Sequence, residues 1–334
     1  MNATINLEKE HFPVLLDELI SIISPLYGGS FIDCTFGQGG YSKKILENKF
    51  NKVIALDRDK DAYFYAKELE KKYINRFYFQ NIKFSEINKD KIKLNDLKAI
   101  IFDLGYSTNQ IKDLSKGLSF KSTGKLNMKM GLNEFSCHEV ISNMSESNLY
   151  KIFKYYGDER YSKKIARKIA RLRNKKIINT QDLTKIIDSV KKFKNSKINN
   201  STKVFQALRI FVNKEISELI NGLINAFYLI PVGGVIAVVT FHSIEDKIVK
   251  YFFKNYSEVK NSSRYVPFRE NNDRCFNLKN RKPITPNAEE LKLNPPSRSA
   301  KLRYAVKINN ECNFEEFIKK FQNLVDIENL QFDK

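Results

Sequence analysis

The sequence predicts an α/β fold in which a mostly parallel sheet is interrupted by an all-helical insertion. Two observations carry this prediction. Four short apolar strands alternate with helical stretches in the first third of the chain: Phe31–Cys34, Val53–Leu56, Phe77–Gln80 and Ala99–Phe102. A fifth strand of the same kind, Val235–Thr240, follows only after a long interval. Strands that are apolar on both faces and joined through helices are typical of a parallel sheet covered on both sides.

The interval between the fourth and fifth strands has the spacing of helices. Leu149, Ile152, Phe153 and Tyr156 recur at i, i+3, i+4 and i+7, and Gly157 follows where a helix cap is expected. The sheet then resumes and includes a last strand near residues 302–306. We therefore expect four segments: a first core part at 1–112, a helical substrate-recognition insertion at 113–200, a second core part at 201–310 and a C-terminal extension at 311–334.

Charge points to a polyanionic partner. In 334 residues, 58 Lys and Arg outnumber 38 Asp and Glu, which gives a formal charge of +20. Nucleic acid is the first candidate and an anionic membrane surface the second. The chain begins with charged residues where a signal peptide needs an apolar stretch, and no apolar run reaches the ~18 residues that span a bilayer. A cytoplasmic protein is expected.

The cysteines are widely separated and form no CxxC pair: Cys34, Cys137, Cys275 and Cys312. This spacing supports neither a zinc site nor a disulfide framework. We expect no metal and a reduced compartment.

A glycine-rich turn, DCTFGQGGYS at residues 33–42, follows the first strand. Gly37, Gly39 and Gly40 let a ligand lie against bare backbone at the carboxyl end of the sheet. Ser42 takes the place of the third glycine of a dinucleotide fingerprint, whereas D-x-x-x-G-x-G looks like the first motif of S-adenosylmethionine-dependent methyltransferases. Asp57 ends the second strand, where a carboxylate can accept hydrogen bonds from both hydroxyls of a ribose. A nucleoside-type cofactor is favoured.

Further motifs occur in a fixed order along the chain: TFGQGGYS, ALDRD, FDLGYSTNQI, GLSFKSTGKLNMKM, VFQALRIFVNKEI, VVTFHSIEDKIVK and KPITPNAEELKLNPPSRSAKLR. Together they resemble the bacterial ribosomal RNA small-subunit methyltransferase H family, cytosine-N4 methyltransferases of the 16S RNA, from about residue 11 to residue 303. The resemblance implies a Rossmann-like class I methyltransferase fold, S-adenosyl-L-methionine as cofactor and the assembled small ribosomal subunit as substrate. It also implies cofactor contacts at Gly39, Gly40, Tyr41, Asp57, Phe84, Asp103 and Gln110.

Several positions depart from the family pattern. Tyr41 stands where histidine is usual, and Tyr106, Thr108 and Asn109 replace the valine, serine and proline of DLGVSSPQ. In a segment expected near the active site, Asn127 and Gly131 replace aspartates. These last changes bear on the details of activity.

The chemistry of an exocyclic amine makes Asp103 and His242 candidate catalytic residues. Asp103 could instead bind the cofactor or only cap a turn, and His242 could be a structural histidine. The lone pair of a cytosine N4 is delocalised into the ring, so the nitrogen must be held in line with the methyl group and offered a hydrogen-bond acceptor. Asp103 ends the fourth strand, where other amino-methyltransferases have a polar residue before a Pro-Pro-aromatic turn, here replaced by DLGYS. His242 ends the fifth strand, and its neighbour Phe241 either stacks on the target base or belongs to the core.

Three groups of residues are candidates for RNA contacts. A basic helix at 161–172 carries Arg167 and Arg171 outside its apolar stripe. Gln206, Arg209 and Asn213 form a polar stripe that faces either RNA or the cofactor cleft, or forms a structural network. Arg298 belongs to a basic segment that offers phosphate ligands.

Three other functions compete with RNA methylation. A nicotinamide dehydrogenase is disfavoured by the missing third glycine and by the charge. A DNA amino-methyltransferase is disfavoured by the missing Pro-Pro-aromatic motif. A catalytically silent RNA-binding or ribosome-assembly protein with the same fold stays open, as do the oligomeric state and the choice between naked RNA and the assembled subunit.

Overall fold

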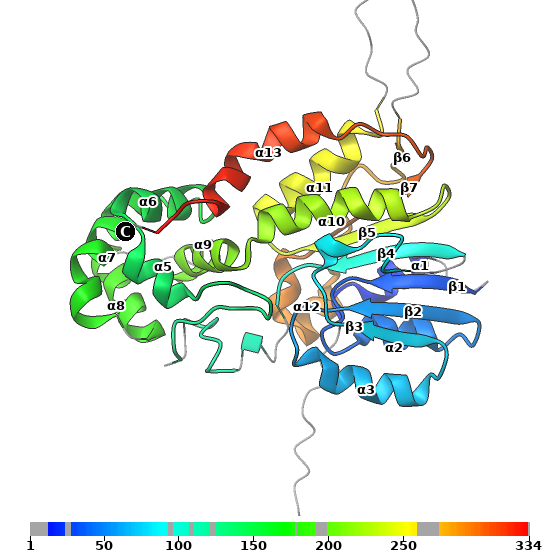
Figure 1. Cartoon of the computed structure of the whole chain (residues 1–334), viewed down its shortest axis with the longest axis horizontal. Helices are drawn as coiled ribbons and strands as arrows, with labels where there is room; N and C mark the ends of the chain where they lie inside the picture. The colour runs from blue at the N-terminus through cyan, green and yellow to red at the C-terminus, as the bar shows by residue number, and fades with distance from the viewer. Residues whose placement is uncertain are drawn as a thin grey trace, which may run out of the picture. The chain divides into compact units, whose positions relative to one another are not determined.

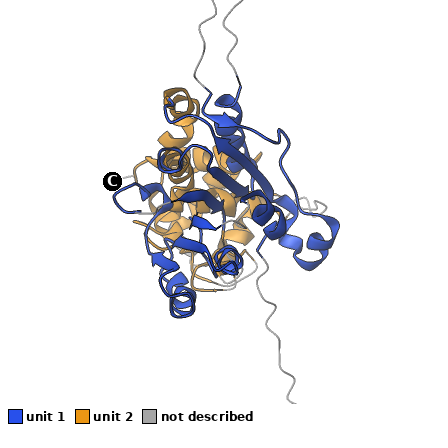
Figure 2. Cartoon of the chain, turned by 90° about the vertical axis from the view of Figure 1, so that its right-hand side faces the viewer, with its two compact units in different colours: residues 1–105, 225–312 blue, residues 106–224, 313–334 orange. Residues whose placement is uncertain are grey.

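The structure is a computed structural model that describes residues 13–23, 28–92, 96–106, 110–111, 113–120, 124–177, 179–191, 199–258 and 274–332. The chain divides into two compact units. Unit 1 comprises residues 1–105 and 225–312, and unit 2 comprises residues 106–224 and 313–334 (Figure 2). Among the described residues, no helix combines the length and the apolar character that crossing a bilayer requires.

Unit 1 contains a sheet whose strand order is β3-β2-β1-β4-β5-β7-β6 (Figure 1). The strands are β1 (Gly29–Asp33), β2 (Asn51–Leu56), β3 (Phe77–Gln80), β4 (Leu97–Asp103), β5 (Val235–Thr240), β6 (Phe276–Asn277) and β7 (Lys301–Lys307). β1 to β5 pair in parallel, whereas β7 runs antiparallel to both β5 and β6. The predicted α/β fold with a mostly parallel sheet is confirmed.

Both faces of this sheet are buried, as the apolar strands predict. On one face Phe31, Val53 and Ile101 join the core that the first three helices complete. On the other face Ile32 and Ile100 are equally inaccessible. The helices of unit 1 are α1 (Leu16–Ile23), α2 (Gly40–Leu46), α3 (Ala62–Lys72), α11 (Ser243–Asn255) and α12 (Ala288–Leu293), with 3-10 turns η2 (Phe84–Glu86) and η3 (Pro295–Ser299).

Unit 2 is helical in its described part. Its helices are α5 (Cys137–Asn143), α6 (Glu146–Tyr155), α7 (Ser162–Lys176), α8 (Thr180–Val190), α9 (Thr202–Asn213) and α13 (Glu315–Glu328), together with the first part of α10 (Glu215–Leu229). The predicted apolar stripe of α6 is buried, and a capping box at Ser136 begins α5.

The helical unit extends further than the expected insertion at 113–200. α9 packs against α5 and α6, so it belongs to unit 2 and not to the resumed core. The C-terminal segment also belongs to this unit. The Glu328 carboxylate accepts hydrogen bonds from the backbone N–H groups of Ile216 and Ser217 at 2.7 and 3.0 Å, and the Tyr156 hydroxyl donates to the Leu324 carbonyl at 2.5 Å. These bonds join the last helix of the chain to the first turn of α10 and the end of α6.

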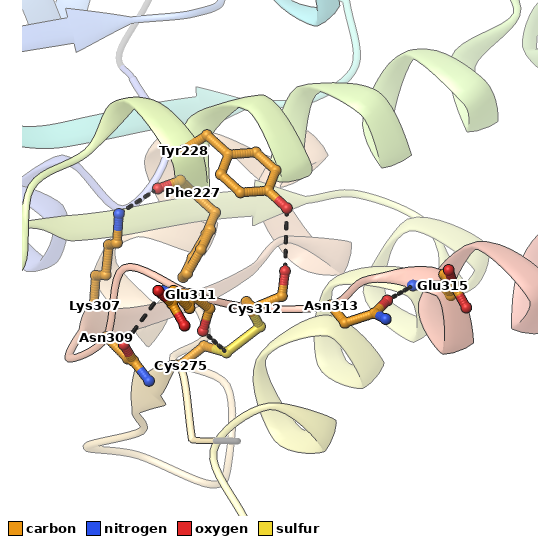
Figure 3. The surroundings of a disulfide bond; sticks show 9 residues. All are labelled: Phe227, Tyr228, Cys275, Lys307, Asn309, Glu311, Cys312, Asn313 and Glu315. Atoms are coloured by element: carbon orange, nitrogen blue, oxygen red, sulfur yellow. Dashed lines mark hydrogen bonds between the residues drawn. A yellow bond between two sulfur atoms is a disulfide. The ribbon is translucent and has the colours of Figure 1, made fainter. Parts of the chain in front are cut away.

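The expectation that the cysteines form no disulfide is wrong. Cys275 and Cys312 are joined by a disulfide within unit 1 (Figure 3). Cys275 immediately precedes β6, and its carbonyl accepts from the Ile308 N–H at 2.9 Å, just beyond the end of β7. Pairing of two strands that are distant in sequence brings the cysteines together, which spacing along the chain does not reveal. Cys34 and Cys137 are buried and take no part in this disulfide.

Candidate active site

The glycine turn predicted after β1 has a backbone that only glycine fits. Gly37 and Gly39 have φ angles of 55° and 77°. A Cβ at Gly39 would come within 2.6 Å of the Phe36 ring, and one at Gly40 within 2.2 Å of the Pro13 ring. Phe36 and Pro13 thus pack directly against this backbone, so internal packing requires glycine at positions 39 and 40. The prediction that a ligand approaches the turn closely is not tested by these contacts.

Asp57, the first residue after β2, holds this turn. Its Oδ2 accepts from the Gly37 N–H and its Oδ1 from the Asp59 N–H, both at 2.8 Å. Burial raises the pKa of Asp57 to about 6, although these two hydrogen bonds lower it. A carboxylate oxygen can accept more than one hydrogen bond. Asp57 can therefore bind the turn and still accept a hydrogen bond from a ligand.

Asp103 ends β4 and is tied to the same turn. Its backbone N–H donates to the Thr35 hydroxyl at 2.7 Å. Burial, followed by the negative charges of Asp33 and Glu245, raises the pKa of Asp103 well above its usual range. Its Oδ1 is buried and has no hydrogen-bond partner among the residues that the structure describes. A buried carboxylate oxygen without a donor is costly, so this atom marks a place for a hydrogen-bonding or cationic ligand group.

Asp33, which the sequence analysis did not include among the site residues, completes the network. It accepts from the Ser42 hydroxyl at 2.7 Å and from the Thr35 N–H at 3.3 Å. Burial raises its pKa to about 6. Its place at the start of the D-x-x-x-G-x-G motif was the signal in the sequence. The side chain joins the end of β1 to the first turn of α2 and so fixes both ends of the glycine turn.

His242 is the N-cap of α11. Its Nδ1 accepts from the Glu245 N–H at 3.4 Å, while the Glu245 carboxylate accepts from the N–H groups of Phe241 and His242 at 2.8 and 3.2 Å. The His242 Nε2 lies 3.0 Å from Glu245 Oε1. With Nδ1 as an acceptor, the proton of a neutral imidazole lies on Nε2. The buried Glu245 was missed from the sequence, although the H-x-x-E spacing of a capping box was visible.

The other predicted cofactor residues lie in different settings. Tyr41 is 3% exposed and its hydroxyl donates to the Val14 carbonyl, so only its backbone is available in the turn. Phe84 belongs to η2 and lies edge-on to Phe102, with ring centroids 5.3 Å apart. Gln110 is half-buried and belongs to unit 2.

The predicted RNA-facing stripe on α9 is instead an internal network of unit 2. Asn213 is 1% exposed. Its side-chain amide donates to the Met128 carbonyl and accepts from the Met130 N–H, both at 2.9 Å. Gln206 donates to the Tyr156 carbonyl at 3.2 Å. Asn213 has almost no exposed surface, which argues against contact of its amide with RNA, whereas Gln206 is half-buried and its contact with RNA stays a prediction.

The predicted basic residues are accessible. On α7, Arg171 is exposed and Arg167 pairs with Glu146 at 3.3 Å, with side-chain exposures of 52% and 42%. An ion pair this exposed is worth little, so Arg167 is available to a stronger anion. Arg298 is exposed on η3 in unit 1.

The sequence was compared with those of known proteins. The model of the MraW methylase family matches residues 8–308. A ribosomal RNA small subunit methyltransferase H from Ehrlichia ruminantium (strain Welgevonden) is 40% identical over 304 residues, which cover 89% of this chain and 99% of that protein. Proteins of the same name from Rickettsia bellii and Bartonella tribocorum are 39% and 38% identical, over 90% and 92% of this chain and 100% and 92% of theirs. The sheet carries the glycine turn and the strand-end carboxylates of a nucleoside-type site. Because the family model matches nearly the whole length, the chain belongs to the MraW methylase family.

Proposed function

We propose that this chain transfers a methyl group from S-adenosyl-L-methionine to the exocyclic N4 of a cytosine in small-subunit (16S) ribosomal RNA. The observation that carries the proposal is the buried Oδ1 of Asp103 at the end of β4, which has no hydrogen-bond partner in the described part of the chain. It is tied through Thr35 to a glycine turn that Asp57 also holds. Membership of the family and the names of its relatives supply the substrate class.

The residues of unit 1 fit this cofactor. The proposed cofactor contacts are the backbone of Gly39 and Gly40 in the turn and the carboxylate of Asp57, which accepts from the ribose hydroxyls. The buried carboxylates favour a cationic ligand over a neutral one. When bound, S-adenosyl-L-methionine supplies an electrophilic methyl group on a sulfonium. The backbone N–H of Tyr41 and the Phe84 ring complete the proposed contacts within unit 1, and a cofactor contact at Gln110 stays a prediction from the family resemblance.

Asp103 and His242 are the proposed catalytic residues. The Asp103 carboxylate accepts a hydrogen bond from the N4 amine, which localises the nitrogen lone pair, and it takes the proton that N4 loses as the new N–C bond forms. A raised pKa makes this carboxylate a stronger base than an exposed aspartate. His242, held by Glu245, orients the N4 group.

RNA binding is assigned to the basic surfaces. Arg167 and Arg171 on α7 and Arg298 on η3 are the proposed phosphate contacts, and the net charge of +20 supports a polyanionic substrate. The proposed substrate is the assembled small subunit, and the proposed location is the cytoplasm.

The test is mass spectrometry of nucleosides from small-subunit RNA of cells with and without the gene, complemented with wild type or with Asp103→Asn. N4-methylated cytidine is expected only with the wild-type gene. Unchanged N4-methylated cytidine after deletion of the gene contradicts the proposed function. Calorimetry with S-adenosylmethionine then distinguishes the two remaining alternatives. A catalytically silent RNA-binding protein does not bind the cofactor, whereas an enzyme that methylates another substrate does.

A further inference from the structure

Tyr106 is a large aromatic side chain that remains exposed. It is 44% accessible, and its hydroxyl has no hydrogen-bond partner among the described residues. Only Leu104 and Gly105 separate it from Asp103 in the chain. Gly105 has a φ of +115°, a conformation that other residues rarely adopt. The turn is thus built so that the chain leaves the end of β4 sharply and an aromatic ring follows at once.

One face of this ring is backed by a fixed cation within unit 2. The Arg209 guanidinium carbon lies 4.8 Å from the centre of the Tyr106 ring. Arg209 is only 7% exposed; its Nη2 donates a hydrogen bond to Glu215 Oε2, and its Nε forms an ion pair with Oε1, each at 2.8 Å. Glu215 therefore holds the guanidinium that lies on the Tyr106 ring.

Arg209 lies over one face of the ring from a buried position, and 44% of Tyr106 remains accessible. The ring therefore has surface left for a ligand on the side away from Arg209. A rigid aromatic face costs little conformational entropy on binding, and nucleobases stack on such faces in single-stranded RNA recognition. An enzyme that modifies an exocyclic amine must take the base out of its stack and provide a replacement surface for it.

We propose that the outer face of Tyr106 stacks on the pyrimidine ring of the target cytosine after the base has been turned out of the RNA. The inference rests on the proposed function and adds a binding residue to it. Arg209, expected from the sequence to contact RNA, instead positions the tyrosine ring. Glu215 holds the Arg209 guanidinium and therefore acts on the base only through Arg209 and Tyr106.

The test uses small-subunit RNA in which the methylated cytosine, first mapped by mass spectrometry, is replaced by the fluorescent analogue pyrrolocytosine. Stacking on a tyrosine quenches this fluorophore. Binding of wild type is expected to quench the analogue, whereas Tyr106→Ala and Tyr106→Val leave it bright. Loss of a base–aromatic stack is expected to lower kcat/KM for unmodified RNA by roughly tenfold or more for the two variants without a ring. S-adenosylmethionine affinity and the thermal midpoint are expected to stay at wild-type values.

Each outcome decides the inference. Quenching that persists in Tyr106→Ala overturns it, whatever the activity of that variant. So does a Tyr106→Phe variant whose kcat/KM falls as far as that of Tyr106→Ala, because the ring is still present. If no cytosine is found to be methylated, the proposed function fails at the mapping step. If the cytosine is mapped and the ring variants behave like wild type, only the role of Tyr106 fails.

Discussion

Cofactor binding at Asp57 is expected to depend on pH in a direction that the structure determines. Burial raises the pKa of this carboxyl from 3.8 to about 6, with the charges of Asp59 and Asp33 adding to the rise and two backbone hydrogen bonds opposing it. Ribose hydroxyls that donate to Asp57 favour its charged form, so its pKa falls when the cofactor binds. Binding therefore releases a proton, and affinity rises with pH up to about pH 6 and is constant above it.

The size of this effect follows from the two pKa values. If binding returns the pKa from about 6 to 3.8, affinity at pH 5 is about tenfold below the plateau. Asp57→Asn and Asp57→Ala are expected to lose this dependence. They also lose the hydrogen bonds to the ribose and weaken binding by about 1–3 kcal/mol, or about 5- to 150-fold.

Isothermal titration calorimetry with S-adenosylmethionine between pH 5 and 8 measures this effect, in two buffers of different ionisation enthalpy so that released protons are counted. Asp61→Asn is the matched control, because that carboxylate is exposed a few residues further along the same turn. Asp33 also titrates near pH 6, and the difference between wild type and Asp57→Asn separates the two groups. Equal affinity and equal proton release in wild type and Asp57→Asn would refute the ribose assignment.

Three further predictions follow from the network at β4, the basic helix and the disulfide. Asp103→Asn is expected to lower single-turnover methylation by at least about tenfold at saturating cofactor, and a normal rate removes Asp103 from the mechanism. Arg167→Ala with Arg171→Ala is expected to lower the slope of log affinity for RNA against log salt by about 0.7–0.9 per lost phosphate contact, while cofactor affinity stays constant. The charge-matched control replaces Lys71 and Lys72, in the last turn of α3, by alanine. If the arginine variant keeps the wild-type salt slope, α7 is only a solvated surface. Replacement of Cys275 and Cys312, which are 37 residues apart, by serine is expected to lower the free energy of unfolding by about 4 kcal/mol, measured by denaturant titration, and an unchanged midpoint contradicts the disulfide.

The parallel part of the sheet was predictable because its signal is local. Each strand from β1 to β5 is a short apolar run, and the residues that follow β1 and β2 already show the turn and the carboxylate of a nucleoside-type site. The hydrogen bonds that link Asp33, Thr35 and Asp103 could not be predicted from such local signals. The Thr35 hydroxyl accepts a hydrogen bond from the Asp103 N–H only because β1 pairs with β4. The spacing of residues within either segment does not reveal this pairing.

The boundaries of the helical unit were missed for a similar reason. α9 follows a linker and has an amphipathic pattern of its own, so nothing in its sequence tells which core it joins. The last helix was expected to be a separate extension, yet Glu328 provides the acceptor for the first N–H groups of α10. A helix cap supplied by a residue more than a hundred positions away leaves no local capping signal.

The residues of α9 show how a polar stripe can be assigned to the wrong partner. Amide and guanidinium groups are suited to directional hydrogen bonds, whether the acceptor is RNA or the protein itself. Sequence reasoning weighed both and favoured RNA, because a solvated surface would have been richer in lysine and glutamate. Asn213 decides the question for its own position, since an amide that is 1% exposed and bonded to Met128 and Met130 has no surface for RNA to meet. Arg209 differs in that its buried guanidinium supports an exposed ring, so the directional group serves recognition only through Tyr106. Exposure of the final side chain, and not the chemistry of the stripe, decides which residue can touch the substrate.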